Sequence, residues 1–131
     1  IIELCSKFEM EIIDLEDEEK SEFLMSYGLE QAGLDRLTKE TFQLLGMETF
    51  FTAGEKEIRS WPIKKNTPAV NAAGCIHSDI ERGFIKAEVY SLENLLEYKS
   101  EEALKNNGKI KQEGKDYIVQ DGDIIYFKFN V

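Results

Sequence analysis

Apolar residues in the first third of the chain recur at helical spacing after a short apolar start. The segment 1–4 has no polar lead-in, and this pattern indicates a strand cut from a larger sheet. Residues 17–28 predict a helix whose buried apolar stripe contains Phe23, Leu24 and Tyr27. The face of a second predicted helix is formed by Leu34, Leu37, Thr41, Leu44 and Leu45.

The rest of the chain begins with the pattern of strands. Residues 49–53 and 58–63 predict a hairpin, in which Pro62 fits an edge strand because proline cannot donate to a ladder. Alanines and isoleucines then predict one helix over residues 69–80. Alternation of apolar and polar residues predicts a strand over residues 84–90.

The chain closes with two short helices and a further hairpin. Ser91 and Ser100 are suited to cap the two helices. An Asp-Gly pair between residues 117–119 and 124–129 predicts the hairpin. This order of elements predicts an α+β fold of the β-grasp, ubiquitin-like type for residues 48–131, with a mixed sheet over one main helix.

The net charge of −10 is concentrated in the first part of the chain. Residues 1–47 contain 12 acidic and 4 basic side chains, whereas residues 48–131 contain 14 and 12. An acidic chain repels phosphate, so we do not expect the whole chain to bind nucleic acid tightly, and DNA is not an expected partner. The charge count leaves open whether the second part carries a local basic face.

The cysteine content favours a reducing compartment. Cys5 and Cys75 are the only cysteines, and no secretory signal accompanies them, so we expect a cytoplasmic protein without a disulfide framework. We expect Cys75 to be a buried, unreactive thiol of the alanine-rich helix. No apolar run approaches the roughly 20 residues that span a bilayer, so no membrane partner is expected.

Five separated segments of the second part carry a distinctive set of motifs in one order. They are residues 50–54 (FFTAG), 57–61 (EIRSW), 72–79 (AAGCIHSD), 83–85 (GFI) and 114–123 (GKDYIVQDGD). Together they resemble the C-terminal TGS module of the Obg-like ATPases of the YchF type, which are P-loop nucleotide hydrolases that associate with ribosomes. TGS modules are β-grasp domains, so the resemblance implies the fold that the local pattern predicts.

The resemblance extends to residues 1–47. There Cys5, Ser6 and Lys7 occupy the place of a turn whose backbone amides lie near the base of the bound nucleotide, with Ser6 where the family usually has alanine. The resemblance implies that residues 1–47 are the end of a P-loop domain with its linking helices. It also implies that ATP and Mg²⁺ bind to the longer parent protein, whose preference for ATP over GTP rests on a motif before Ile1.

We expect no catalytic residue, metal site or cofactor within these 131 residues. A P-loop of the form G-x-x-x-x-G-K-[ST] is absent, and residues 108–116 come nearest with five intervening residues and Asp116 in place of Ser/Thr. The sole histidine, His77, has no second histidine or cysteine pair beside it. A helix-end histidine bonded to backbone is therefore favoured over a ligand-binding one.

One set of residues of the second part could contact the phosphates of RNA, with Trp61 between them as a stacking surface. The set consists of Arg59, Trp61, Lys64, Lys65, His77, Arg82 and Lys86. The alternative is a solvated face with the tryptophan packed into the sheet. Only the association of the resembled family with ribosomes favours the RNA contact.

Two functions stay open at this point. In the first, the module contacts the ribosome, through the large subunit or ribosomal RNA, while the P-loop domain of the parent hydrolyses ATP. In the second, the module folds back on its own P-loop domain and tunes hydrolysis without binding RNA. The sequence of the module alone does not separate the two.

Overall fold

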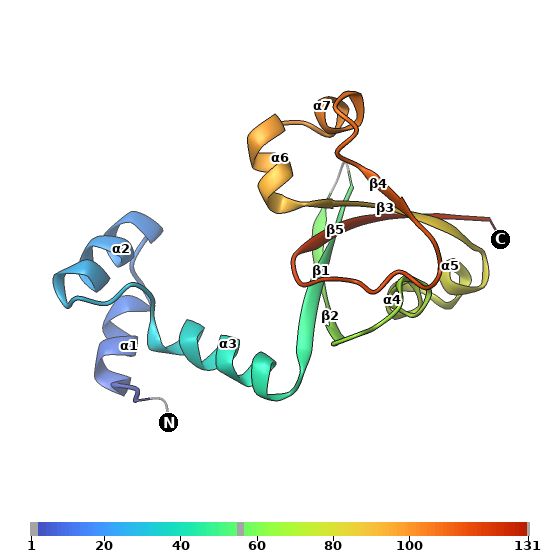
Figure 1. Ribbon diagram of the computed structural model, residues 1–131. Helices are drawn as coiled ribbons and strands as arrows, with labels where there is room; N and C mark the ends of the chain where they lie inside the picture. The colour runs from blue at the N-terminus through green and yellow to red at the C-terminus, as the bar shows by residue number, and fades with distance from the viewer. Residues whose placement is uncertain (1–2, 55–56, 131) are drawn as a thin grey trace. The chain divides into compact units, whose positions relative to one another are not determined.

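The computed structural model describes residues 3–54 and 57–130 of the chain. Its contacts divide the chain into two compact units, Ile1–Leu45 and Gly46–Val131, drawn from blue to cyan and from green to red in Figure 1. The predicted strand at residues 1–4 falls partly outside the described residues. Glu3 and Leu4, which are described, belong to no helix or strand.

The first unit contains three helices, α1 (Ser6–Ile12), α2 (Asp17–Ser26) and α3 (Gly33–Leu44). The sequence pattern predicted α2 and α3 but not α1. The helix α1 has only seven residues, and its apolar side is marked by Phe8 and Ile12 alone, which is too little for a periodicity to emerge.

A small apolar cluster holds the first unit together. Ile12, Leu24 and Ala32 are its buried members. The rings of Phe8 and Phe23 pack against it, with their centroids 5.4 Å apart. Tyr27, which was predicted to lie in the buried stripe of α2, is 61% exposed, so the prediction was wrong for this residue.

The start of α3 is bound to α1 through one carboxylate. Glu9 accepts hydrogen bonds from the backbone N–H of Gly33 at 2.9 Å and of Leu34 at 3.4 Å. A negative charge here compensates the positive end of the helix dipole. A Cβ at Gly33 would lie 2.4 Å from Cδ2 of Leu4 and 2.7 Å from Oε1 of Glu9, so the ends of these two side chains would have to move to admit a side chain here.

The second unit is built on a five-stranded mixed sheet with four helices among the described residues. Its elements are β1 (Met47–Ala53), β2 (Ile58–Lys64), α4 (Ala69–Ile76), α5 (Ser78–Arg82), β3 (Phe84–Ser91), α6 (Leu92–Tyr98), α7 (Glu101–Asn106), β4 (Lys111–Glu113) and β5 (Asp123–Phe129). The strand order is β2-β1-β5-β3-β4, and only the β1–β5 pair is parallel. This confirms the predicted α+β class, and the order is compatible with a β-grasp.

The main core lies between the sheet and α4. Ala69, Ala72 and Ala73 of α4 are fully buried and allow the helix to approach the sheet closely. A second cluster, around Tyr90 and Leu104, lies at α6 and α7. Figure 1 shows α4 and α5 together on one side of the sheet and α6 and α7 away from them.

The first hairpin is confirmed in its register and in its edge position. Phe50 lies opposite Trp61, and Thr49 lies opposite Pro62. β2 is the outermost strand of the sheet, where a proline without an N–H is tolerated. Residues 55 and 56 of the predicted turn lie outside the described residues.

The predicted closing hairpin was wrong. β5 pairs with β3 and β1, whereas Ile118 forms an isolated bridge with Pro68. The Asp-Gly turn forms its hydrogen bonds with β1. Asp121 accepts a hydrogen bond from the N–H of Thr49 at 2.8 Å. Gly122, whose φ is 84°, donates to the carbonyl of Thr49 at 2.8 Å. Tertiary hydrogen bonds therefore override the local hairpin signal.

Two predictions about the helix over residues 69–80 were also wrong. The helix ends at Ile76, and a new short helix, α5, begins after His77, whose backbone is extended. Cys75, predicted to be buried, is exposed because Ala72 and Ala73 occupy the buried side of α4.

We find no helix among residues 3–54 and 57–130 with the length and apolar character needed to cross a membrane.

Candidate nucleic-acid interface

The edge strand β2 presents Arg59 and Trp61 on the same side as the core. Trp61 is half-buried against the α4 cluster and donates from Nε1 to Oγ1 of Thr52 at 3.0 Å. The Arg59 guanidinium lies 5.6 Å from the centroid of the tryptophan ring, and its Nε is 3.6 Å from the Glu57 carboxylate. A base that stacked on this ring would have to compete with Arg59.

Lys64 and Lys65 lie at the end of β2, and both are exposed. Lys65 is fixed through its backbone, because its N–H donates to the carbonyl of Gly46 at 2.8 Å. Among the described residues neither lysine has a carboxylate within salt-bridge distance. Their charges are therefore available to a phosphate without breaking an ion pair.

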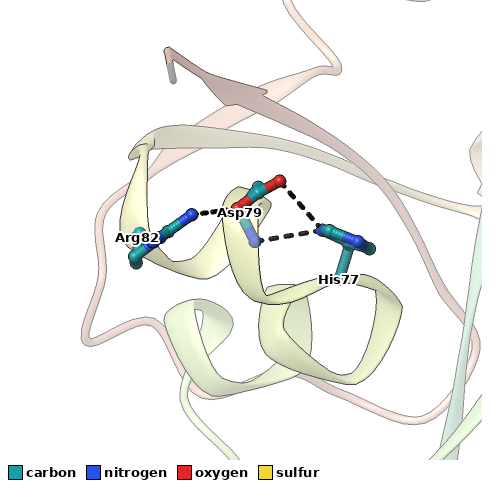
Figure 2. A network of polar contacts seen from close by, with 3 residues as sticks. All are labelled: His77, Asp79 and Arg82. Carbon is teal, nitrogen blue, oxygen red and sulfur yellow. Dashed lines mark hydrogen bonds and ion pairs between the residues drawn. The ribbon is translucent and has the colours of Figure 1, made fainter.

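His77 and Arg82 both interact with Asp79, as Figure 2 shows. The Nδ1 of His77 accepts a hydrogen bond from the N–H of Asp79 at 3.1 Å and lies 3.4 Å from its carboxylate. Because Nδ1 is an acceptor, the proton of the neutral ring lies on Nε2. Arg82 donates to the other carboxylate oxygen of Asp79. His77 is thus the cap that joins α4 to α5, and Arg82 is already neutralised.

Lys86 is part of a polar network across strands. Its Nζ donates to Oε1 of Gln112 at 2.6 Å, and Gln112 donates to Glu88 at 3.4 Å. Glu88 also pairs with Lys128 at 2.8 Å. This lysine therefore has hydrogen-bonding partners within the sheet.

The structure does not bring the predicted basic residues into one patch. β1 and β5 lie between β2 and β3, so Lys86 is about 14 Å from the strand of Arg59 at the usual strand spacing. Arg59, Arg82 and Lys86 have protein partners, whereas Lys64 and Lys65 have no ion pair among residues 3–54 and 57–130.

Sequence reasoning did not include Lys109 and Lys111, which together line a small hollow of about 120 Å³. Asn94 and Tyr117 also line it. Nζ of Lys109 lies 5.6 Å from the ring centroid of Tyr98. The sequence does contain a pattern that indicates this basic segment. Lysines occur at 105, 109, 111 and 115 around Gly108, and Glu113 is the sole acidic residue between them.

Cys5, Ser6 and Lys7 lie at the start of α1. Cys5 has an extended backbone, and its carbonyl accepts the N–H of Glu9 at 3.0 Å. All three residues are exposed. An open hollow of about 520 Å³ lies beside Cys5 and is lined partly by Phe8 and Tyr27. A planar apolar group would find aromatic surface there.

No three potential metal ligands from His, Cys, Asp and Glu gather within the described part of the chain. Two tyrosines form side-chain hydrogen bonds with carboxylates. The hydroxyl of Tyr90 donates to Glu101 at 2.5 Å, and that of Tyr117 donates to Asp123 at 2.8 Å. Burial raises the pKa of both phenols well above the ordinary 10.0, and the hydrogen-bonded carboxylates raise it further.

The raised pKa values of these two phenols predict that the second unit loses stability in alkali. Above about pH 10 the unfolded phenols lose their protons while the folded ones keep them, so the stabilisation is complete below that pH and is lost as the pH rises toward the folded pKa values. Urea unfolding followed by Trp61 fluorescence measures this dependence. The double variant Tyr90→Phe and Tyr117→Phe should show a flatter decline, and an identical decline would contradict the assignment.

The second unit matches a known family model. The model covers residues 47–130, and its description reads YchF-GTPase_C, protein of unknown function (DUF933). The match begins at the first residue of β1 and ends one residue after β5, so it contains the entire sheet.

Similarity to known proteins covers both units. Ribosome-binding ATPase YchF of Bacillus subtilis (strain 168) is 51% identical over all 131 residues, which are 36% of its own length. Obg-like ATPase 1 of Caenorhabditis elegans is 43% identical over 99% of this chain and 33% of its own. The solved YchF GTPase of Schizosaccharomyces pombe superposes with a TM-score of 0.83 at 34% identity, over 95% of this chain and 33% of that one. The chain therefore spans about a third of the length of these relatives.

Proposed function

Because the chain belongs to the YchF-GTPase C-terminal family, we propose that it is the C-terminal part of a cytoplasmic, ribosome-binding ATPase of the Obg-like type. The observation that carries the proposal is the similarity to the Bacillus subtilis ribosome-binding ATPase along the whole chain. In this proposal residues 48–131 are the TGS module, and residues 1–47 are the end of the P-loop domain with its linking helices.

Hydrolysis would take place outside these residues. ATP and Mg²⁺ would bind to the P-loop domain, since the phosphate-binding motif is absent from this sequence. Cys5, Ser6 and Lys7 would contribute the turn beside the adenine. The exposed start of α1 and the adjacent hollow with Phe8 fit that role.

The proposed role of the second unit is to contact ribosomal RNA through lysines that have no ion pair among the described residues. Lys64, Lys65, Lys109 and Lys111 meet this condition. A cation without a carboxylate partner can neutralise a phosphate at no cost in broken ion pairs, whereas Arg59 and Arg82 would first have to leave Glu57 and Asp79.

Sedimentation with purified ribosomes over a salt series tests the contact. We expect the double variant Lys64→Glu and Lys65→Glu to bind more weakly, with a slope of log affinity against log salt smaller by about 1 for each phosphate that is no longer neutralised. The control is the pair Lys39→Glu in α3 and Lys105→Glu in α7, which changes the net charge equally at exposed positions. Equal weakening in both pairs would mean that only net charge matters, and unchanged binding in the first pair would remove these lysines from the interface.

A further inference from the structure

The hollow at Lys109 and Lys111 lies across three neighbouring strands of the sheet. Ser91 at the end of β3 is paired with Asp123 at the start of β5, and Val89 is paired with Lys111 at the start of β4. Paired residues, and residues two positions apart on a strand, share a face of the sheet. Lys111 and Asp123 therefore project from one face, on the two sides of β3, and both line the hollow.

Charges of opposite sign line the two sides of this hollow without neutralising each other. Because β3 lies between β4 and β5, the backbones that carry Lys111 and Asp123 are about 10 Å apart at the usual strand spacing. Neither lysine forms an ion pair with a carboxylate among residues 3–54 and 57–130. Glu113 contributes to the raised pKa of Tyr117 but is not among the residues that line the hollow. The lining thus has two cations and one anion.

One oxygen of the Asp123 carboxylate is open to a ligand. Oδ2 accepts hydrogen bonds from the Tyr117 hydroxyl and from the N–H of Gln120. Oδ1 accepts none from the described residues, yet no fully buried side-chain oxygen or nitrogen in that part of the chain lacks a partner. Oδ1 therefore touches solvent, and Asp123 lines the hollow. It can accept one further hydrogen bond from a donor that enters there.

Polar groups on the other side of the hollow are free to donate. Nζ of Lys109 lies 5.6 Å from the ring centroid of Tyr98, and such a cation–π contact at an exposed site is weak, so the flexible side chain can turn toward an anion. Ser91 accepts the N–H of Asn94 at 3.2 Å, and its own hydroxyl proton has no acceptor among the described residues. The hollow therefore offers three side-chain donors beside one open carboxylate oxygen.

This arrangement favours a ligand that carries an anion and a hydroxyl donor next to each other. A simple anion would meet the Asp123 carboxylate, and a cation would meet the two lysines. The volume of about 120 Å³ corresponds to about four water molecules of the liquid, which is room for a phosphate and a hydroxyl but not for a nucleobase as well. In RNA each phosphate follows a ribose whose 2′-hydroxyl can donate, and DNA lacks this donor.

We propose that this hollow takes one phosphate and the adjacent ribose 2′-hydroxyl of an RNA strand, so that it distinguishes RNA from DNA. Lys109 and Lys111 neutralise the phosphate, and Oδ1 of Asp123 accepts the hydrogen bond of the 2′-hydroxyl. The choice of RNA over another sugar phosphate rests on the proposed function, whereas the need for an anion beside a hydroxyl rests on the lining of the hollow.

Fluorescence anisotropy of the full-length protein with three uridine oligomers of equal length tests the inference. The first oligomer has ribose, the second has 2′-deoxyribose, and the third has 2′-fluororibose, which keeps the sugar conformation of RNA but cannot donate. We expect the ribose oligomer to bind about tenfold more tightly than either of the others at the same salt concentration, because only it can donate to the carboxylate. Equal affinity for all three would overturn the proposal. Tight binding of both the ribose and the fluororibose oligomers would do the same, since it would show readout of sugar shape alone.

A pair of lysine variants connects this preference to the hollow. Lys109→Gln with Lys111→Gln should bind the ribose oligomer more weakly, lose the preference for ribose, and reduce the slope of log affinity against log salt by about 0.7 for each phosphate that is no longer neutralised. The control is Lys105→Gln with Lys115→Gln, which removes the same charge at exposed positions that do not line the hollow. The control should keep the tenfold preference. A preference that persists in the first pair would place the ribose contact elsewhere and overturn the assignment.

Two further measurements separate the hollow from its alternatives. Ribose 5-phosphate in excess should not displace the oligomer, and displacement would show a site for a free sugar phosphate, contrary to the proposal. Ribosome sedimentation of the same protein tests the proposed function independently. If ribosomes bind but the ribose preference is absent, only the hollow is wrong. If ribosomes do not bind at all, the proposed function fails, and a ribose preference would still support the hollow as an RNA site.

Discussion

Replacing Gly83 by alanine is expected to lower the free energy of unfolding of the second unit by about 2–3 kcal/mol. A Cβ at this position would lie 2.2 Å from the carbonyl oxygen and 2.8 Å from the carbonyl carbon of Asn130. These are backbone atoms at the end of β5, and the N–H of Asn130 donates to the carbonyl of Gly83 at 3.0 Å. To relieve this clash, the start of β3 and the end of β5 would have to move apart.

Thermal unfolding followed by Trp61 fluorescence measures the effect, since this is the only tryptophan and lies in the second unit. A domain of this size should lose on the order of 10 to 20 °C in Tm for such a change. Gly114→Ala is the control, because nothing lies within 4 Å of a Cβ there, so its stability should be unchanged or slightly higher. A similarly mild effect at Gly83 would contradict the close approach of Asn130.

Replacing Asp123 by alanine is expected to cost about 3 kcal/mol, the second large effect. Asp123 is 8% exposed, and its Oδ2 accepts hydrogen bonds from the Tyr117 hydroxyl at 2.8 Å and from the N–H of Gln120 at 2.9 Å. Alanine would leave the Tyr117 hydroxyl and the Gln120 N–H without the acceptor that this nearly buried carboxylate provides. Urea unfolding with Trp61 fluorescence is again the measurement.

The size of this effect distinguishes the structure from the hairpin that the sequence suggested. In a simple hairpin Asp123 would be an exposed turn residue, and its removal would resemble that of the exposed Asp116, whose change to alanine should cost less than about 0.5 kcal/mol. Tyr117→Phe combined with Asp123→Ala should cost less than the sum of the two single changes. Additive effects would argue against the hydrogen bond between them.

Local signals predicted the parts of the fold that depend on neighbours in sequence. The β1–β2 hairpin was predicted because its pairs, from Met47 and Lys64 inward, are close along the chain. The break between α4 and α5 at His77 was not predicted, since it depends on a ring nitrogen that accepts a hydrogen bond from the N–H of Asp79. The Asp-Gly turn was wrongly predicted to close a hairpin, because its hydrogen bonds go to Thr49, which is 72 positions from Asp121.

The candidate interface was harder to predict for a related reason. The sequence shows where lysines and arginines occur but not whether a carboxylate neutralises them. Arg82 is joined to Asp79, whereas Lys65 has no ion pair in the described part of the chain. An apolar hollow lined by Phe51, Leu95 and four other side chains joins residues far apart in sequence, so no local pattern could indicate it.

The parallel pairing of β1 with β5 also governs when the second unit can form during synthesis. Phe51 is paired with Ile124, so the two central strands come from opposite ends of the unit. The nascent chain can close the β1–β2 hairpin early, but α4 has no complete sheet to cover until β5 has been made. Closing so long a loop is slow, and the apolar faces of β1 and β3 would stay open in the meantime. A growing chain would therefore expose surface that attracts chaperones until its last strand joins the sheet.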